Sequence, residues 1–525
     1  MNSENSKLFK QRLFSLHSHV GITISIIFYI SLFFGTFTIF MPYIQVWEKH
    51  SRHFEVSQKK EIDYAKIIDS VISDIDYPKN NIFVTLPGFK NDPSIRVSHQ
   101  FVETKYFNPN TEKEIIDEKA RSYLAGFIDK LHTGKAWGFI PVLLFGLMSV
   151  GVMFLIIGGL LLVNYLKFKN NGKNQQSTFS KWHRKILIFT FFPLLMISLS
   201  GALMNIGYKS VSPMTYVLTK GDETNFFKLT NPVLLPKEKV VIPSKINAKM
   251  LSINQLIEKA KKINPQVTFH NLQLINWNDK NARLELTGYN PYRPFLNGIY
   301  NKPKIIFNAV DGSIIKDERV LERSWSILLS DSVYFLHLLY NVDIISRTFI
   351  ALLMLFSTIA IGFGVMLWLE KKAKVFDNKV TFYHWMGKFS LATMIGVIPA
   401  TASLFVLQWG LPFDLENRVL IQQVVFYNFW IATLMWSFYR INSYIAAKEF
   451  LFLGGILFIL ASIVHLVISG FSPIELFQQN MVSILGVDIV LMALGILLIC
   501  IAIILPKKRE EAKIFWNKKY QRIIK

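Results

Sequence analysis

The stretch LHSHVGITISIIFYISLFFGTFTIF, residues 16–40, joins two histidines to a long apolar run. The run from 20 to 42 is long enough to cross a bilayer, because a helix that rises 1.5 Å per residue needs about 20 residues to span the hydrocarbon core. It is too long for a signal-peptide core and has no small-residue cleavage site, so we expect an uncleaved membrane span. His17 and His19 therefore stand at the mouth of a transmembrane helix.

More apolar runs of spanning length follow, and 51% of the 525 residues are hydrophobic. Such a composition is typical of a chain whose mass lies mostly in the bilayer. We therefore predict a polytopic α-helical membrane protein with about eight transmembrane helices, at residues 20–42, 138–166, 184–206, 344–369, 388–410, 419–440, 449–470 and 482–505.

Lysine and arginine gather in connections that would lie on one side of the membrane. Residues 167–185 hold six basic residues and no acidic one, and residues 370–379 and 507–525 are also basic. Basic short loops mark the cytoplasmic side, so we predict a multi-pass protein of the bacterial inner membrane with both termini in the cytoplasm. Anionic membrane lipid then accounts for much of the net charge of +22. No nucleic-acid-binding motif accompanies that charge, so we expect no nucleic-acid partner.

Two long segments, 43–137 and 207–343, would face outward, and each has the pattern of a small α+β domain. This repeat of span, outer domain and span suggests an internal duplication. Asp311-Gly312 marks a hairpin turn in the second segment. The predicted helix and strands lie at 61–75, 81–86 and 94–102 in the first segment, and at 252–263, 266–275, 282–289 and 304–318 in the second.

The single cysteine, Cys500, lies in the last span, which excludes an intrachain disulfide, a CxxCH attachment of c-type haem and a cysteine-held iron–sulfur cluster.

These predictions divide the chain into seven parts. The parts are a cytoplasmic N-terminus with the first span (1–42), the first outer domain (43–130), spans two and three (131–206), the second outer domain (207–332), span four (333–372), an appended four-helix bundle (373–505) and a basic cytoplasmic tail (506–525).

Each of the first four spans has a histidine at its N-terminal mouth. Because the spans alternate in direction, His17 or His19 can meet His183 near the cytoplasmic face, and His132 can meet His337 near the outer face. Facing imidazoles in a helical bundle hold b-type haem by two axial nitrogens, and ionisable groups at membrane depth are usually functional. The sequence therefore predicts two haems b, one in each layer. Any single histidine could instead be an ordinary interfacial residue.

Positions two apart on a helix point about 200° away from each other, so His17 and His19 cannot both enter one pocket. His17 shares a face with Gly21, and a glycine lets a planar cofactor or a neighbouring helix approach the backbone. We therefore predict His17 as the inner iron ligand together with His183. His19 and His384, which opens the fifth span, are the less favoured alternatives.

Haem propionates need cations near the membrane interface. Arg12 and Arg184 are placed to serve the inner layer, and Lys135 and Arg347 the outer one, although basic side chains at helix ends often simply reach for the headgroups. His465, in the seventh span, is expected to be a buried hydrogen-bonding residue between helices. The loop histidines show no metal-ligand spacing; they are His50, His53, His99 and His270.

The motifs around the four histidines resemble those of the PepSY-associated transmembrane helix family, over roughly residues 10–440. Leu187, four residues after His183 in the third span, departs from the family pattern, because a glycine that allows close packing often stands at this position in the family. The family includes iron-regulated membrane proteins and dihaem ferric-siderophore reductases, and its outer segments are PepSY domains. Its histidines match His17, His132, His183 and His337. The motifs are LHSHVG (16–21), LHTGKAWG (131–138), WHRKI (182–186), SLSGALM (198–204), LHLLYN (336–341) and IGFGVMLWLEKK (361–372).

The resemblance implies an oxidoreductase that reduces a ferric chelate, such as a ferric siderophore, so that iron is released for uptake; the residues themselves support only an oxidised acceptor outside. No GxGxxG follows a strand, so the electron donor would be a quinol or a separate cytoplasmic reductase. A competing interpretation is a non-enzymatic PepSY membrane sensor or binding protein of the cell envelope. A metal permease is less favoured, because the centres of the spans are almost wholly apolar.

Overall fold

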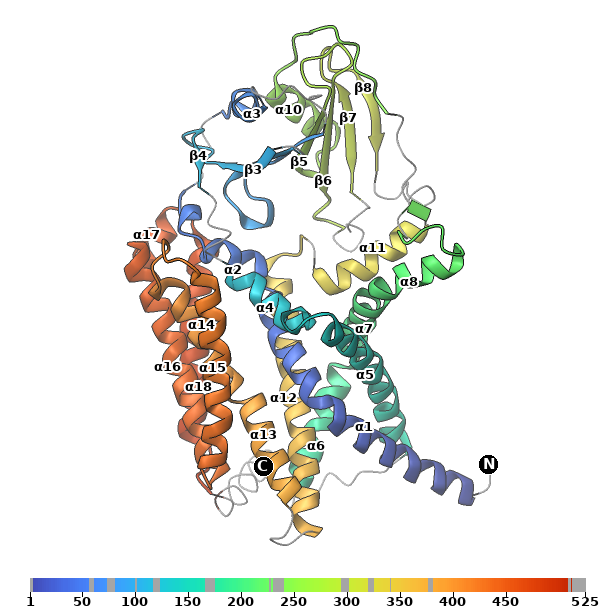
Figure 1. The fold of residues 1–525 in the computed structure, drawn as a ribbon, viewed down its shortest axis with the longest axis vertical. Helices are drawn as coiled ribbons and strands as arrows, with labels where there is room; N and C mark the ends of the chain where they lie inside the picture. The colour runs from blue at the N-terminus through green and yellow to red at the C-terminus, as the bar shows by residue number, and fades with distance from the viewer. Residues whose placement is uncertain are drawn as a thin grey trace.

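The computed structural model of the chain has two parts, a bundle of membrane helices and a sheet domain at one end of it (Figure 1). We call the end of the bundle beneath the sheet domain the sheet end, and the opposite end, where α1 begins, the N-terminal end. The structure describes residues 3–55, 61–72, 81–99, 102–116, 123–165, 175–225, 228–229, 240–293, 302–319, 325–339, 341–375, 381–508 and 511.

Among these residues, seven helical segments are long and apolar enough to cross a membrane, and a bent helix pair supplies an eighth. The predicted polytopic helical fold is therefore confirmed, and each predicted span has its counterpart. The spanning helices are α1 (Ser3–Thr38), α5 (Phe139–Tyr165), the pair α6 (Gln175–Phe189) and α7 (Phe191–Ala202), α12 (Ile344–Val375), the segment of α13 (Thr381–Met394) and α14 (Val397–Gly410), α15 (Arg418–Tyr439), α16 (Ser443–Ser469) and α18 (Val482–Ile504).

Proline explains both breaks inside spanning segments. Helices α6 and α7 meet at an angle of 71°, four residues before Pro193, and α13 gives way to α14 four residues before Pro399. A proline ring clashes with the carbonyl four residues earlier and has no N–H to donate to it, so a helix interior breaks there. Buried Thr190 lies at the first break, and its hydroxyl accepts a hydrogen bond of 2.9 Å from Ser357 on α12.

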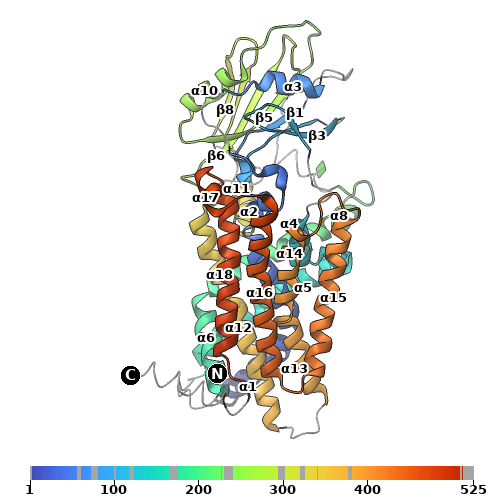
Figure 2. The ribbon, with the colours of Figure 1, turned by 90° about the vertical axis from the view of Figure 1, so that its left-hand side faces the viewer.

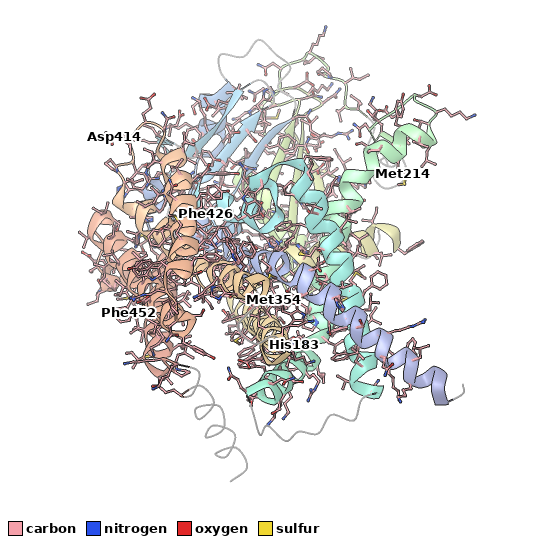
Figure 3. All side chains as sticks on the ribbon, turned by 60° about the horizontal axis from the view of Figure 1, so that its bottom comes forward. His183, Met214, Met354, Asp414, Phe426 and Phe452 are labelled. Carbon is pink, nitrogen blue, oxygen red and sulfur yellow. The ribbon has the colours of Figure 1, made fainter. Side chains whose placement is uncertain are left out.

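The last helices form the appended bundle, which stands beside α1 and α12 (Figure 2). Its interior is aromatic, with Phe426 fully buried, whereas Phe452 on α16 is 45% exposed and lies at the outer edge of the bundle (Figure 3). Exposed apolar side chains on membrane helices are the surface that lipid covers. Short helices sit at the sheet end, namely α2 (Met41–Trp47), η1 (His50–Arg52), α4 (Leu124–Thr133), η3 (Lys135–Trp137), η4 (Leu203–Gly207), α8 (Tyr208–Leu218), α11 (Trp325–Leu338) and α17 (Pro473–Gln478).

The two long segments each contribute a helix and a run of antiparallel strands, as the sequence patterns predict. Together they build one eight-stranded sheet in the order β4-β3-β2-β1-β5-β6-β7-β8. The first segment supplies α3 (Tyr64–Ile72), β1 (Ile82–Thr85), η2 (Phe89–Asn91), β2 (Ile95–His99), β3 (Val102–Phe107) and β4 (Glu114–Ile115). The second supplies α10 (Ile253–Ile263), β5 (Thr268–Ile275), β6 (Arg283–Tyr289), β7 (Lys304–Asn308) and β8 (Ile314–Glu318).

Antiparallel pairing of β1 with β5 fuses the two α+β units into one body. Phe83 lies opposite Gln273 and Val84 opposite Leu272 in this register. One hydrophobic core runs under both units and includes Ile68 of α3 and Ala260 of α10, both fully buried. The two α+β units therefore share one sheet and one core.

A pair of cysteines tests this pairing. Phe83→Cys with Gln273→Cys, in a Cys500→Ser background, should form a disulfide on mild oxidation, because opposed antiparallel residues have Cα atoms about 4.5–5.5 Å apart. Phe83→Cys with Glu285→Cys is the matched control, since Glu285 lies one strand further on, opposite Gln273, at about twice the strand spacing of 4.8 Å. Mass spectrometry of peptides reports the crosslink. Equal crosslinking of both pairs would contradict the shared sheet.

Candidate functional site

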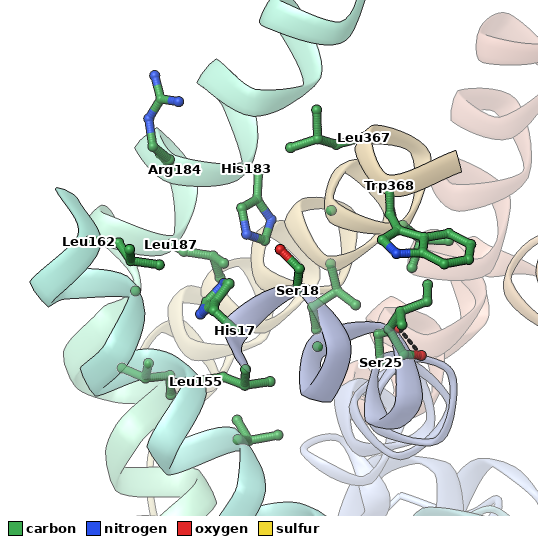
Figure 4. A pocket seen from close by; sticks show the side chains of 18 of the residues that line it. His17, Ser18, Ser25, Leu155, Leu162, His183, Arg184, Leu187, Leu367 and Trp368 are labelled. Carbon is green, nitrogen blue, oxygen red and sulfur yellow. Dashed lines mark hydrogen bonds between the residues drawn. The ribbon is translucent and has the colours of Figure 1, made fainter. Parts of the chain in front are cut away.

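His17 of α1 and His183 of α6 face each other at the N-terminal end of the bundle. Their ring centres lie 6.5 Å apart and the planes cross at 73°. Both rings border a cavity of about 250 Å³ that lies between α1, α5, α6 and α12. Its walls are mostly apolar, with Leu187 and Trp368 among them, and Figure 4 shows the two imidazoles reaching into it from different helices.

His132 and His337 form a second pair at the sheet end. Their ring centres lie 5.9 Å apart and the planes are inclined by only 29°. His132 stands in the last turn of α4 and His337 in the last turn of α11. Burial, and to a smaller extent the nearby His132, lowers the pKa of His337 to about 4. This imidazole is therefore neutral at physiological pH and can offer a nitrogen lone pair.

Each of the four imidazoles lies against a glycine of a neighbouring helix. A Cβ added to Gly35 would stand 2.9 Å from Cε1 of His132, and one added to Gly364 would stand 2.9 Å from Cε1 of His183. The corresponding distances are 3.3 Å from Gly159 to His17 and 3.3 Å from Gly201 to His337. Without a Cβ, the helix backbone leaves room for a ring to lie flush against it. The same local device thus recurs at all four positions.

The carbonyl one turn before the glycine orients the ring. Nδ1 of His132 donates to the carbonyl of Ser31 at 2.7 Å, and Nδ1 of His183 donates to that of Ala360 at 2.8 Å. These carbonyls precede Gly35 and Gly364 by four residues, and each has a second lone pair to offer beside its helical hydrogen bond. Because Nδ1 carries the proton, Nε2 holds the lone pair, which is the tautomer that a metal-binding histidine needs.

The other two rings vary this arrangement. His337 Nδ1 lies 3.0 Å from the hydroxyl oxygen of Ser200, and the His337 ring also hydrogen-bonds the backbone of Ile197, again four residues before its glycine. His17 Nδ1 is buried and has no hydrogen-bond partner. The N-terminal pair therefore has one ring fixed by the backbone and one fixed by packing alone.

The length of helix α1 between the two histidine pairs gives their separation. It carries His17 of the first pair and Gly35, the glycine that contacts His132 of the second pair. Eighteen residues of helix at 1.5 Å each correspond to about 27 Å. This is close to the thickness of about 30 Å of the hydrocarbon core. The two pairs thus stand near opposite faces of a membrane, as the alternation of the spans predicts.

The alternative histidines lie elsewhere. His19 is exposed, and its Nδ1 contacts the carbonyl of Ser15 on its own helix at 2.8 Å. His384 is exposed on α13 and does not line the cavity of His17 and His183. The structure therefore brings His17, and neither of these two, to His183.

The four predicted cations differ in placement. Arg184 lines the cavity, and its guanidinium extends away from the two rings toward Ser180, to which Nη1 donates at 2.6 Å (Figure 4). Arg12 and Lys135 are exposed. Arg347 is buried and donates to three backbone carbonyls, those of Val342, Ile39 and Leu339, at 3.0, 2.6 and 2.6 Å. Since Ile39 directly follows α1 and Leu339 directly follows α11, Arg347 ties the ends of these two helices together.

One cation that lines this cavity was not among those predicted from the sequence. Lys371, near the end of α12, lines the same cavity as His17, with its ammonium 4.5 Å from the centre of the Phe14 ring. The sequence predicts only a basic cytoplasmic margin at 370–379, and the packing of α12 against α1 brings one of its lysines to the cavity.

The profile of the PepSY-associated TM region matches residues 14–371 of this sequence. The chain belongs to this family. The match begins three residues before His17 and ends at Lys371, so it contains all four paired histidines and their glycines. No curated protein matches the sequence. The appended bundle lies beyond the matched region.

The glycine contacts give a matched prediction. Gly364→Ala places a methyl group 2.9 Å from the His183 ring, and overpacking of this kind costs about 1–3 kcal/mol. Gly362→Ala, on the same helix, meets nothing within 4 Å and should be neutral or stabilising by up to about 1 kcal/mol through better helix propensity. Thermal unfolding of the purified protein measures both. Equal midpoints would show that the glycine contact does not constrain the ring.

Proposed function

We propose that this family member is a dihaem b-type electron-transfer protein of the bacterial inner membrane. His17 and His183 would hold one haem iron near the cytoplasmic face, and His132 and His337 the other near the outer face. The proposed activity is reduction of an external ferric chelate, such as a ferric siderophore, beneath the sheet domain. Electrons would come from a quinol or a separate cytoplasmic reductase. Each haem, when bound, supplies one-electron redox chemistry.

The spacing of the rings is the observation that carries this proposal. Two imidazoles on opposite sides of one metal ion, each bound by about 2.0–2.1 Å, have ring centres about 6 Å apart. The observed separations are 6.5 Å and 5.9 Å. Two pairs match this distance independently, although they are built from different helices.

The surroundings of the pairs favour a metal that brings its other ligands with it. Among the residues that the structure describes, no group of three or more His, Cys, Asp or Glu side chains could hold a metal ion. A bare ion at a histidine pair would therefore have only the two imidazoles as ligands from these side chains, whereas haem iron has four further ligands from its macrocycle. The apolar cavity between α1 and α12 also suits the faces of a porphyrin.

The chain's own residues have separable tasks in this proposal. The Ser31 and Ala360 carbonyls keep Nε2 of His132 and His183 unprotonated for the iron. Arg184 and Lys371 line the cavity of the cytoplasmic-side pair and would serve anionic propionates there. The sheet platform above His337 would exclude bulk water from the acceptor and position it.

Haem content tests the proposal directly. The purified wild-type protein should contain two haems b per chain. His17→Ala or His183→Ala should remove one, and His132→Ala or His337→Ala the other, because each substitution takes away one of the two protein ligands of that iron. Pyridine haemochrome assays and reduced-minus-oxidised spectra measure the loss, and the spectra should differ between the two sets of variants.

His19→Ala and His384→Ala are matched controls, since both side chains are exposed histidines on spanning helices, and both variants should keep two haems. Folded wild-type protein without haem would overturn the proposal and favour the non-enzymatic sensor or binding protein. Loss of both haems from every variant would contradict the assignment of separate pairs.

A further inference from the structure

The two histidines of the sheet-end pair, His132 and His337, stand on short helices beneath the sheet domain (Figure 1). Helix α4 has 10 residues and α11 has 14. Helices of this length are marginally stable by themselves, because an isolated helix needs about 12–15 residues or more to persist in water. The place of each ring therefore depends on what holds the end of its helix. In both cases a charged residue of another element does so.

Glu48, which directly follows α2, caps the N-terminus of α4. Its Oε2 accepts the N–H of Ala125 in the first turn at 2.8 Å, whereas Tyr123, which precedes the helix, makes no side-chain capping bond. The first N–H groups of a helix have no partner within the helix. Ala125 and Glu48 are both buried, so the carboxyl oxygen satisfies a donor that water does not reach. His132 follows Ala125 by about two turns.

The appended bundle in turn holds the end of α2. The backbone carbonyl of Glu48 accepts from Nε2 of Gln408 on α14 at 2.7 Å, and the indole of Trp47 donates to Asp488 on α18 at 3.0 Å. Oδ2 of Asp488 lies 2.8 Å from Nδ1 of His465 on α16, which confirms His465 as a buried hydrogen-bonding residue between helices. Glu48 thus reaches α4 from a backbone that is itself fixed on three sides.

Arg347, in the first turn of α12, holds the C-terminal end of α11. Its Nη2 donates to the carbonyl of Leu339 at 2.6 Å and its Nε to that of Val342 at 3.0 Å. Leu339 directly follows α11 and has a φ of +50°. A left-handed backbone is uncommon for a residue with a Cβ, so the guanidinium holds a turn that leucine does not favour. His337 stands two residues before this turn.

The same guanidinium also reaches the helix that supports the other ring. Its Nη1 donates to the carbonyl of Ile39 at 2.6 Å, and the N–H of Ile39 donates to the carbonyl of Gly35 at 3.2 Å. Gly35 is the glycine that lies against His132. Only a planar fork of several N–H donors can serve carbonyls in three directions. Arg347 thus connects the helix of His337 with the backbone that supports His132.

We propose that Glu48 and Arg347 are positioning residues of the sheet-end pair. Glu48 sets the place of His132 through the N-terminus of α4, and Arg347 sets the place of His337 relative to Gly35 through the end of α11. Together they maintain the ring separation of 5.9 Å and the inclination of 29°. The inference rests on the proposed function in one respect, that these two rings share a haem iron, whereas the ties at the helix ends exist without haem.

Hydrogen–deuterium exchange of the full-length protein tests the ties, whether or not haem is bound. Glu48→Ala removes the acceptor of the Ala125 N–H and should raise exchange within residues 124–133 by about fivefold, since loss of a cap costs about 1 kcal/mol. Arg347→Lys should raise exchange within residues 331–339. Burial raises the pKa of Glu48 to about 8, so glutamine resembles the protonated carboxyl. Glu48→Gln, which keeps an acceptor oxygen, should therefore exchange as the wild type does.

Transfer of haem to excess apomyoglobin tests the consequence for the pair. The transfer phase that is absent from His132→Ala identifies the sheet-end haem. This phase should be about tenfold faster or more in Glu48→Ala and Arg347→Lys, because groups that orient metal ligands are typically worth 10–100-fold in affinity. The other phase should keep its rate, and Glu48→Gln should restore the first. Arg347→Lys keeps the positive charge, so unchanged transfer in this variant would overturn the role of Arg347 and favour a propionate counter-charge.

Glu416→Ala and Arg319→Gln are the matched controls and should behave as the wild type. Glu416 is exposed in the loop after α14, and Arg319, directly after β8, is 71% exposed. The proposal is overturned if Glu48→Ala exchanges like the wild type, or if it releases both haems equally faster. Should Arg347→Lys fail to fold, the contrast between Glu48→Ala and Glu48→Gln still decides it. Wild-type protein without haem would overturn the proposed function alone, and the exchange experiment would still test the ties.

Discussion

Contact between an imidazole and the bare backbone of a glycine is the constraint on which the arrangement of the core depends. Packed helices stand about 8–10 Å apart, which leaves no room for a ring between two ordinary residues. Gly35, Gly159, Gly201 and Gly364 make that room, each for one histidine. The glycine fixes the depth of each ring, and at His132 and His183 the carbonyl one turn before the glycine also fixes the tautomer. The close packing of α1 against α5 and of α6 against α12 thus places nitrogen lone pairs within the bundle.

Breaks in the helices bring the histidines and their glycines to both ends of the bundle. Pro193 ends α6 and turns the chain by 71° into α7, so that one span presents His183 at the N-terminal end and Gly201, the contact of His337, at the sheet end. Short helices α4 and α11 carry His132 and His337 beneath the sheet domain. A straight helix would present its side chains around a single axis. The broken geometry lets one layer of side chains converge near each face of the membrane.

The sequence predicts local features, such as the positions of the spans, and misses contacts between residues that are far apart in the chain. Apolar runs locate all eight spans, and alternation of direction sorts the histidines into two layers, because both depend on length and period alone. The choice of His17 over His19 follows from helix geometry. Pairing of β1 with β5 and contact of Gly35 with His132 join residues far apart in the chain, and neither leaves a periodic signal. Gly21, predicted to share a face with His17, lines the same cavity as that ring and lies against Leu155 of the neighbouring α5, whereas the contact of Gly159 with the His17 ring was not predicted.

Helix α2 joins the matched region to the appended bundle through two adjacent residues. Trp47 donates to Asp488 on α18, and Glu48 accepts the N–H of Ala125 in the first turn of α4. The carbonyl of Glu48 also accepts from Gln408 on α14. Burial raises the pKa of Glu48 to about 8, so this side chain is held at the end of α4 at the cost of its charge. Since α4 carries His132, a change of packing around Asp488 has a short covalent and hydrogen-bonded path to the sheet-end histidine pair. Trp47 and Glu48 are therefore the hydrogen-bonded link between the appended bundle and the helix that carries His132.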